Sequence, residues 1–477
     1  MEMTQFFVGV DFGSTDYIWQ VPTSLVIDST GNPRLRCDDH FSPQPDEPSG
    51  SLSFNWIKLA LLHQDDQPRC SIWENASRTW RHSMRSKDII ALFLRTLLQP
   101  PLMEMQRSQP ELDRALMQFN IIFTFPASWG MDDRKRMKEA VAAIGIEDLV
   151  PDSQVSTLYL SEQEAAFLSM LSHEKVDLQE LVVICDVGGW TLDTAAYVTG
   201  CRDPIYNVNP IYECGKARSD HHGALFLHDS ISELLRDEIE SVTGNRDWLD
   251  DAAELPYIMD RLNHVVMYYN GHQGSNKHHS QKVEKIMESI NDALNNAKIA
   301  YQHRYETSAT SIRIVLTGGL SCNTYVEATV VTLVEERYGD SVNLFLPEKS
   351  KRWNAVSIGA AMHGLIEHFR DSPITDTLVE RTSPAHFFVK RKHGNGTISI
   401  VTLAGQGQPI QIKQSTCQIP DVGSVTEAGG RILVVYYRQG NMEGKFCPDR
   451  EFGFLTIDLL VDGVVRSDLV LAEHHFA

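Results

Sequence analysis

The stretch from Leu181 to Tyr197 has the residue types of a phosphate clamp. An unbroken apolar run, short enough for a buried strand, leads to a turn at Gly188-Gly189, and a second apolar run follows. Glycines at such a turn let backbone N–H groups approach a polyphosphate with no Cβ in the way, and Thr191 adds a hydroxyl donor. Asp186, at the end of the first run, is placed to orient a Mg²⁺ ion or its water. The pattern therefore predicts a hairpin that binds phosphate.

The same order of residues occurs once more, near the N-terminus. There an apolar run from Phe6 to Val10 leads into Asp11, Gly13, Ser14 and Thr15. Either copy alone is also the pattern of an ordinary hairpin with an Asp-Gly turn. Two copies favour a duplicated unit, in which two hairpins hold one nucleotide from opposite sides.

A third glycine element lies further along the chain. A strand predicted over 312–316 ends at Thr317, and Gly318-Gly319 leads into a helix predicted to reach Tyr338. A strand, a double glycine and a helix in this order allow a base or ribose to lie against backbone, although many α/β crossovers share the pattern.

Other polar residues allow two interpretations each. Lys58 lies among aromatic and aliphatic neighbours, where its long side chain reaches either solvent or a cleft. Glu162 and Glu164 open a predicted helix, where carboxylates favour the positive N-terminus without any catalytic role. The histidine-containing stretch 271–280 is interpreted as a solvated loop rather than a metal site, followed by a helix over 282–301.

Composition limits the classes of partner. The 477 residues suggest about three domains. A formal charge of −20, with no basic stripe interleaved with aromatics, makes nucleic acid a poor partner. No signal-peptide pattern and no apolar run of membrane-spanning length is found, so no membrane partner is expected. Eight scattered cysteines without a C-x-x-C pair indicate reduced thiols and a cytoplasmic or nuclear location.

The three glycine elements, in this order, resemble those of the superfamily of actin, the sugar kinases and the seventy-kilodalton heat-shock proteins. Asp11–Thr15 resembles its first phosphate loop, Asp186–Asp193 the second and Leu316–Leu320 the adenosine loop. Ser161–Ala166 and Ala355–Ala361 are similar to its two connecting helices. The resemblance implies an α/β fold with duplicated ribonuclease-H-like (actin-like) ATPase lobes.

Within the superfamily, Phe123–Trp129 looks like the heat-shock branch, and the chain is most similar to its divergent, lid-less members in fungi and animals. We expect ATPase lobe I at 1–195 and lobe II at 196–372. A composition shift near residue 372 predicts a small all-β C-terminal domain, 373–477, which resembles a truncated peptide-binding domain. Its strands are expected at 387–391, 397–402, 410–413, 432–437 and 455–461.

The resemblance also implies roles for individual residues. Asp11 and Asp186 would hold Mg²⁺, through water. The implied catalytic residues are Lys58, Glu162, Asp186 and Thr191. The implied nucleotide-binding residues are Asp11, Gly13, Ser14, Thr15, Gly188, Gly189, Thr191, Gly318 and Gly319. The implied chemistry is in-line attack of water on the γ-phosphate, driven by positioning and charge neutralisation.

Several positions depart from the family pattern. Trp190 replaces the third glycine of the second phosphate loop, where its bulk would narrow the γ-phosphate pocket, and Asp16 adds a negative charge after the first. Leu320 and Cys322 stand where the typical chaperone has a small hydroxyl and an arginine against adenine. Trp353-Asn354 replaces an acidic pair before the second connecting helix. Slow hydrolysis, or binding without hydrolysis, is consistent with these changes.

The expected function is that of an ATP-binding, chaperone-like ATPase of the heat-shock type. It would bind protein or peptide clients under control of ATP or ADP, with slow Mg-ATP hydrolysis and a co-chaperone as a further partner. The first alternative is a nucleotide-binding scaffold or pseudo-ATPase. A sugar-kinase-type phosphotransferase is a second, which would need a polar substrate pocket with a positioned base.

Overall fold

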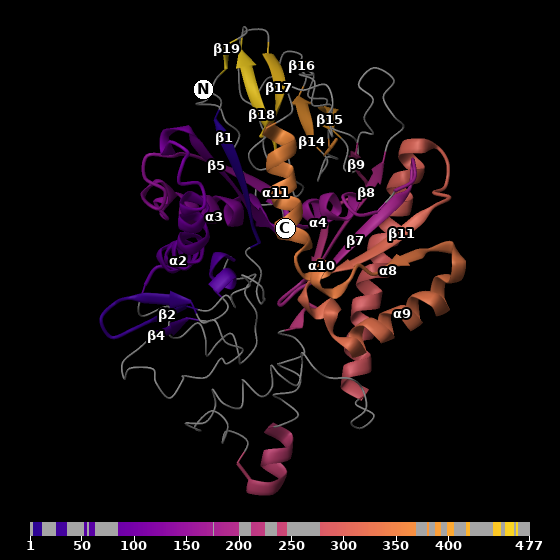
Figure 1. Ribbon diagram of the computed structural model, residues 1–477. Helices are drawn as coiled ribbons and strands as arrows, with labels where there is room; N and C mark the ends of the chain where they lie inside the picture. Colours follow the sequence, from indigo (N-terminus) through magenta and orange to yellow (C-terminus); the bar gives the residue numbers. More distant parts are fainter. Residues whose placement is uncertain are drawn as a thin grey trace.

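The computed structural model describes nine main segments of the chain. They are residues 3–11, 25–35, 52–54, 57–62, 84–174, 176–199, 211–224, 236–245 and 277–368. Beyond them it describes strand backbone at 379–380, 387–392, 398–404, 416–419, 442–449, 454–461 and 464–465. The fold is mixed α/β, with helices packed against mixed sheets (Figure 1).

The first sheet is parallel and has the strand order β1-β5-β6. β1 (Thr4–Val10) pairs with β5 (Met117–Phe125), which pairs with β6 (Gln154–Ser161). β5 is almost entirely buried, as expected for the central strand of a parallel sheet. The helices α2 (Ser86–Arg107) and α3 (Met131–Ala142) contribute side chains to the core formed with this sheet.

A small antiparallel sheet adds to the same core. It consists of β2 (Leu25–Ile27), β3 (Pro33–Leu35) and β4 (Leu52–Phe54). A 3₁₀ helix, η1 (Ile57–Leu61), follows and buries every residue except Lys58 in the first core. This packing fixes the backbone on either side of Lys58.

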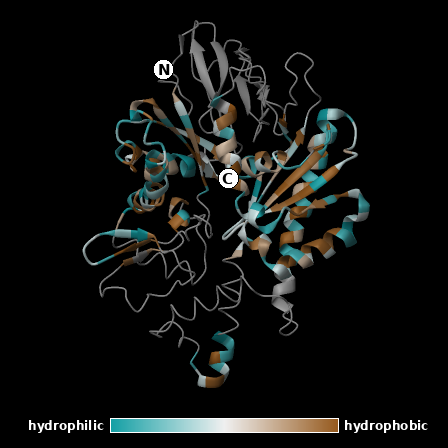
Figure 2. Ribbon diagram, in the orientation of Figure 1, coloured by the Kyte–Doolittle hydropathy of each residue, from teal (hydrophilic) through white to brown (hydrophobic). Residues whose placement is uncertain are grey.

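The second sheet has seven strands in the described residues, with the order β12-β11-β7-β8-β9-β13 and β10 beside β8. β7 and β8 form an antiparallel hairpin, whereas β11 and β12 run parallel to β7. The strands are β7 (Leu181–Val187), β8 (Leu192–Thr199), β9 (Ile211–Glu213), β10 (Arg218–Asp220), β11 (Ile312–Thr317), β12 (Asn343–Phe345) and β13 (Val379–Glu380). Figure 2 shows hydrophobic colours along the central strands, which agrees with the complete burial of β7 and β11.

Two long helices, α8 (Lys277–Tyr305) and α9 (Thr324–Tyr338), form a second core with this sheet. α8 begins five residues earlier than the predicted Lys282, so the interpretation of the whole stretch 271–280 as a loop was wrong from Lys277 onward. Shorter elements connect these parts: η5 (Gly319–Cys322), η6 (Gly339–Ser341) and α10 (Lys349–Trp353). Among the described helices, none has the length and apolarity needed to cross a bilayer.

Two helices, α4 (Glu162–Leu171) and α11 (Ala355–His368), cross between the two sheets (Figure 1). The crossing depends on glycine, because a Cβ on Gly359 would lie 1.7 Å from the Ala165 carbonyl oxygen. A Cβ on Gly9 would likewise lie 1.9 Å from the Ser357 carbonyl oxygen, so α11 also contacts β1 through backbone. Buried residues of α4, α11 and the second sheet form a third core, which joins the two halves.

Beyond β13, the described segments are antiparallel strands. β14 pairs with β15, and a separate four-stranded sheet consists of β16, β17, β18 and β19. Their bounds are β14 (Phe387–Lys392), β15 (Ile398–Ala404), β16 (Thr416–Ile419), β17 (Met442–Asp449), β18 (Phe454–Val461) and β19 (Val464–Val465). The strands predicted at 387–391, 397–402 and 455–461 are present within one or two residues. Those predicted at 410–413 and 432–437 lie outside the described residues.

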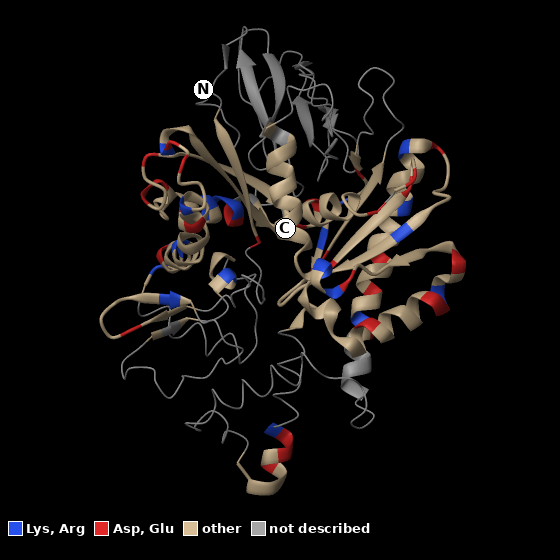
Figure 3. Ribbon diagram, in the orientation of Figure 1, with Lys and Arg blue, Asp and Glu red and all other residues tan. Residues whose placement is uncertain are grey.

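Charged side chains lie mainly on the helices, as Figure 3 shows, while most strand positions carry none. Acidic residues at the strand ends of the two sheets are therefore exceptions to the pattern of this fold.

Candidate functional site

Four carboxylates and one ammonium group come together where strands of both sheets end. Asp11 follows β1, Glu162 follows β6, and Asp186 lies near the end of β7. Lys58, from η1, donates a hydrogen bond of 2.5 Å to Glu162 Oε1, with side chains only 12% and 6% exposed. The charges of Asp11 and Asp193 also act on Lys58. We call Asp11, Glu162, Asp186 and Asp193 the acidic cluster.

The β7–β8 turn has the predicted hairpin geometry. Asp186 pairs with Asp193 across the ladder, and the Gly188 N–H donates to the Thr191 carbonyl oxygen at 3.0 Å. Gly188 is half-buried, and a Cβ there would meet nothing nearer than 3.4 Å, whereas Gly189 is buried. The Thr191 hydroxyl donates to Asp193. The turn therefore places Gly188 and Thr191 beside two members of the acidic cluster.

The sequence interpretation did not assign Asp193 a role. Its carboxylate accepts hydrogen bonds from Thr191, from Ser219 and from Ser128 Oγ, the last at 3.3 Å. Ser128 follows β5, so this contact links the first sheet's loop to the second sheet. Thr191 and Asp193 are two residues apart on an extended segment, which places them on one face. This spacing of two residues was the signal in the sequence from which a role for Asp193 could have been predicted.

The loop after β5 is itself held by a buried side chain. Gln163 Oε1 accepts a hydrogen bond of 2.9 Å from the Ala127 N–H. The same loop carries Trp129, whose ring lies 5.8 Å from Lys58 Nζ. Neither Gln163 nor Trp129 was assigned a role from sequence, because both contacts join segments far apart in the chain.

Trp190 packs away from the hairpin that carries it. Its ring lies 4.6 Å from that of His221, and it packs against the first core. The Gly223 N–H donates to the Trp190 carbonyl oxygen at 3.0 Å, and a Cβ on Gly223 would lie 2.4 Å from the Trp190 carbonyl carbon. The indole therefore bridges the second sheet's turn and the first core.

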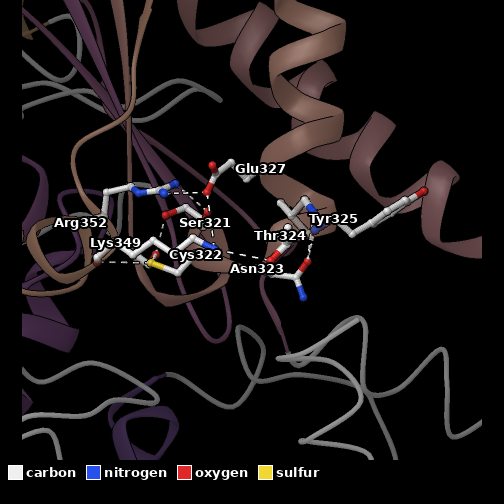
Figure 4. Close-up of polar contacts among 10 residues, drawn as sticks. Ser321, Cys322, Asn323, Thr324, Tyr325, Glu327, Lys349 and Arg352 are labelled. Carbon is white, nitrogen blue, oxygen red and sulfur yellow. Dashed lines mark hydrogen bonds and ion pairs between the residues drawn. The ribbon is translucent and has the colours of Figure 1, made fainter. Parts of the chain in front are cut away.

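The Gly318–Cys322 loop, which contains Gly319, lies directly beside the hairpin. Gly318 has a φ of +86°, and a Cβ there would lie 2.2 Å from Asp186 Oδ1. Leu320, one of the departures from the family pattern, has its side chain buried in the second core. Cys322 is half-buried and contacts the backbone carbonyls of Gly318 and Lys349 (Figure 4).

Burial raises the pKa of each carboxyl group in the acidic cluster. The pKa of Glu162 rises to about 7, because burial and the charges of Asp11 and Asp193 outweigh the opposing effect of Lys58. The pKa of Asp186 lies well above its usual range, through burial and then the charge of Glu162. Burial lowers the pKa of Lys58, but the charge of Glu162 first, then that of Asp11, raises it overall. The cluster thus has more negative than positive groups, and an added cation would be stabilised there.

The acidic cluster offers only oxygen atoms to a metal ion. In the described part of the chain, no group of three or more His, Cys, Asp or Glu side chains is arranged to hold a metal ion. Mg²⁺ binds oxygen ligands and usually keeps several waters, so Asp11 and Asp186 would hold it only through water. Gly13, Ser14 and Thr15 lie outside the described residues, so of the first clamp only Asp11 can be placed.

No protein-family model and no curated protein matches the chain. Function is therefore inferred from the geometry of the site.

Proposed function

We propose that the chain binds Mg-ATP between two actin-like lobes, 1–195 and 196–372, and hydrolyses it slowly, as a divergent member of the seventy-kilodalton heat-shock family. The observation that supports this is the convergence of polar residues from separate segments in one buried cluster. Its members are Asp11, Lys58, Glu162, Asp186 and Asp193. A cluster of raised-pKa carboxyls around a buried lysine is typical of functional sites.

The hairpin and the lysine would bind the phosphates. Gly188 offers backbone without a Cβ, and Thr191 offers a hydroxyl, which donates to Asp193 in the structure. Bound Mg²⁺ would neutralise phosphate charge in the cluster. The Lys58 ammonium, held by Glu162, adds a fixed positive charge in a buried position, where its effect on phosphate is strongest.

Glu162 and Asp193 are the carboxylates available to orient an attacking water. With a pKa of about 7, Glu162 can accept a proton and release it again near neutral pH. Asp193 is held in place by three hydroxyl groups, so its orientation is fixed before any ligand arrives. Hydrolysis at this site needs positioning and charge, with no covalent intermediate on the protein.

The strands beyond residue 373 would form the β-rich domain that holds an extended segment of a protein client. The crossing of α4 and α11 connects the nucleotide site with the second half of the molecule, since Glu162 is the first residue of α4. We place this activity in the cytoplasm.

A pseudo-ATPase scaffold is the second candidate. Trp190 favours it, because the indole packs both on His221 and on the first core. Such packing would hold the two halves together whether or not nucleotide is bound.

The direct test is equilibrium binding of ATP, with and without Mg²⁺, to the wild-type chain and to Asp186→Ala. We expect Mg²⁺-dependent binding that weakens at least about tenfold in the variant, because a carboxylate of the cation site is lost. Asp340→Ala, at an exposed acid in η6, is the matched control and should bind as the wild type does. If the wild type binds no ATP under any condition, the fold has lost the nucleotide and the proposal is wrong.

A further inference from the structure

A buried arginine forms hydrogen bonds both to the Gly318–Cys322 loop and to the helix that follows it (Figure 4). Arg352, in α10, is only 3% exposed. Its Nη1 donates to the Ser321 carbonyl oxygen at 2.8 Å, and its Nη2 donates to Glu327 Oε2 at 2.6 Å. Its own carbonyl oxygen accepts from the Gly318 N–H at 3.4 Å. One residue therefore contacts the start of the loop, its interior and the first turns of α9.

Further hydrogen bonds fix the same loop. Ser321 Oγ donates to the Gly318 carbonyl oxygen at 2.6 Å. Cys322 Sγ lies 3.5 Å from the Lys349 carbonyl oxygen, and Asn323 caps α9 by accepting from the N–H groups of Tyr325 and Val326. The loop is thus pre-formed, which lowers the conformational cost of binding a ligand to it.

Space filling alone does not explain why residue 352 is an arginine. Within the described part of the chain, Arg352 Nε is buried and has no hydrogen-bond partner. A buried donor without a partner destabilises the folded state, so an apolar residue would serve better if filling space were the only requirement. The guanidinium is retained where its planar fork joins the Ser321 backbone to the Glu327 carboxylate.

The location of the loop relative to the acidic cluster suggests what it contacts. At one end, Gly318 touches Asp186 and the backbone of Val187. The other end, at Cys322, is held by α10 and α9. If the phosphates of a nucleotide lie at Gly188 and Thr191, the nucleoside of the same nucleotide would therefore contact this loop.

We propose that Arg352 is the positioning residue for the nucleoside end of the bound nucleotide. It sets the shape of the Gly318–Cys322 loop and does not itself need to touch the base. The inference rests on the proposed function, since it requires that phosphate binds at the acidic cluster. It predicts that phosphate affinity and nucleoside affinity can be separated by substitution.

The test compares two ligands, Mg-ATP and Mg-tripolyphosphate, by equilibrium binding. Arg352→Met should weaken ATP binding at least about tenfold and leave tripolyphosphate binding within about twofold, because only the loop loses its support. Arg352→Lys keeps the charge beside Glu327 but cannot bridge Ser321 and Glu327 together, so it should restore part of the ATP affinity. Lys351→Met is the matched control on the same helix, since its ion pair with Glu348 is exposed, and it should change neither ligand.

Four outcomes would overturn the role of Arg352. Equal loss of both ligands in folded Arg352→Met would show that the residue supports the phosphate end as much as the nucleoside end, and unchanged ATP binding would show that the loop needs no such support. If the wild type binds tripolyphosphate and ATP equally well, the loop makes no nucleoside contact. If the wild type binds neither ligand, the proposed function fails, and the role of Arg352 falls with it.

Glu327→Gln provides the test if Arg352→Met does not fold. It leaves the guanidinium in place and removes only the charge that holds it. ATP binding should weaken by about threefold to fivefold, again without loss of tripolyphosphate binding. Thermal unfolding of each variant checks that folded protein is compared. An unchanged ratio of the two affinities would contradict the proposal.

Discussion

Lys58 provides the positive charge that faces Glu162 in the acidic cluster. It lies in a 3₁₀ helix whose other residues are buried, so the backbone of Lys58 is held in place opposite the carboxylate. Trp129 lies 5.8 Å away and adds a favourable cation–π contact. At the scale of single residues, the site is therefore organised by one buried ion pair.

Lys58→Met should separate binding from hydrolysis. Loss of the fixed charge should slow the proposed ATP hydrolysis by about 100-fold or more, while Mg-ATP binding weakens far less. Single-turnover hydrolysis and equilibrium binding measure the two effects. Lys285→Met, at an exposed lysine of α8, is the control. Wild-type turnover in Lys58→Met would exclude a catalytic role for this residue.

At the scale of elements, the crossing of α4 and α11 requires the absence of a side chain. Both helices contact each other through backbone at Gly359 and Ala165, where even one methyl group overlaps a carbonyl oxygen. Interiors are packed closely enough that such an overlap forces the helices apart.

Gly359→Ala should therefore destabilise the protein by about 2 kcal/mol or more, despite the higher helix propensity of alanine. Chemical denaturation measures the loss. Gly130→Ala is a matched control, because a Cβ there meets only Asp133 Oδ2 at 3.7 Å, and it should cost less than about 1 kcal/mol. A Gly359→Ala variant as stable as the control would show that the crossing tolerates a side chain.

Local signals in the sequence predicted the secondary-structure elements better than they predicted contacts between distant residues. The β7–β8 hairpin and the strand ending at Thr317 were predicted, because apolar runs bounded by glycines are local patterns. The start of α8 was misplaced, since polar residues with histidines give no apolar periodicity. The contacts of Asp193 with Ser128 and of Arg352 with Ser321 were not predicted, because each depends on how distant segments pack.

The resemblance and the spacing grouped different residues. The resemblance named Lys58 and Glu162 together, although they are 104 residues apart, and their side chains are in contact in the structure. The roles assigned to the two residues stay predictions. Spacing alone left Lys58 open between a surface and a cleft position. Leu320, which departs from the family pattern, packs its side chain into the second core.

At the scale of the whole molecule, stability and charge are connected. The chain has a formal charge of −20, and the carboxyl groups of Glu162, Asp186 and Asp193 are buried together, with the half-buried Asp11 beside them. The pKa of Glu162 is about 7 in the folded chain, against an ordinary value of 4.5. Between these values the folded state binds more protons than the unfolded state, so stability falls as the pH rises.

The free energy of unfolding should therefore decrease from pH 5 to pH 7, by up to about 1.4 kcal/mol per pH unit for this one group. Glu162→Gln should flatten the dependence, because the amide does not titrate. Glu288→Gln, at an exposed glutamate, is the control and should retain the wild-type slope. Denaturation at a series of pH values, without Mg²⁺, measures the slope. An unchanged slope in Glu162→Gln would assign the effect to other groups.

The contact between α4 and α11 also has a mechanical consequence. Because backbone lies against backbone where Gly359 meets Ala165, no side chain stands there to deform, so a displacement of α4 is passed on to α11. Glu162 lies within one turn of Ala165, and Gly9 of β1 packs against Ser357 of α11. The crossing is therefore a stiff coupling, through which a shift at Glu162 would reach both α11 and the first strand.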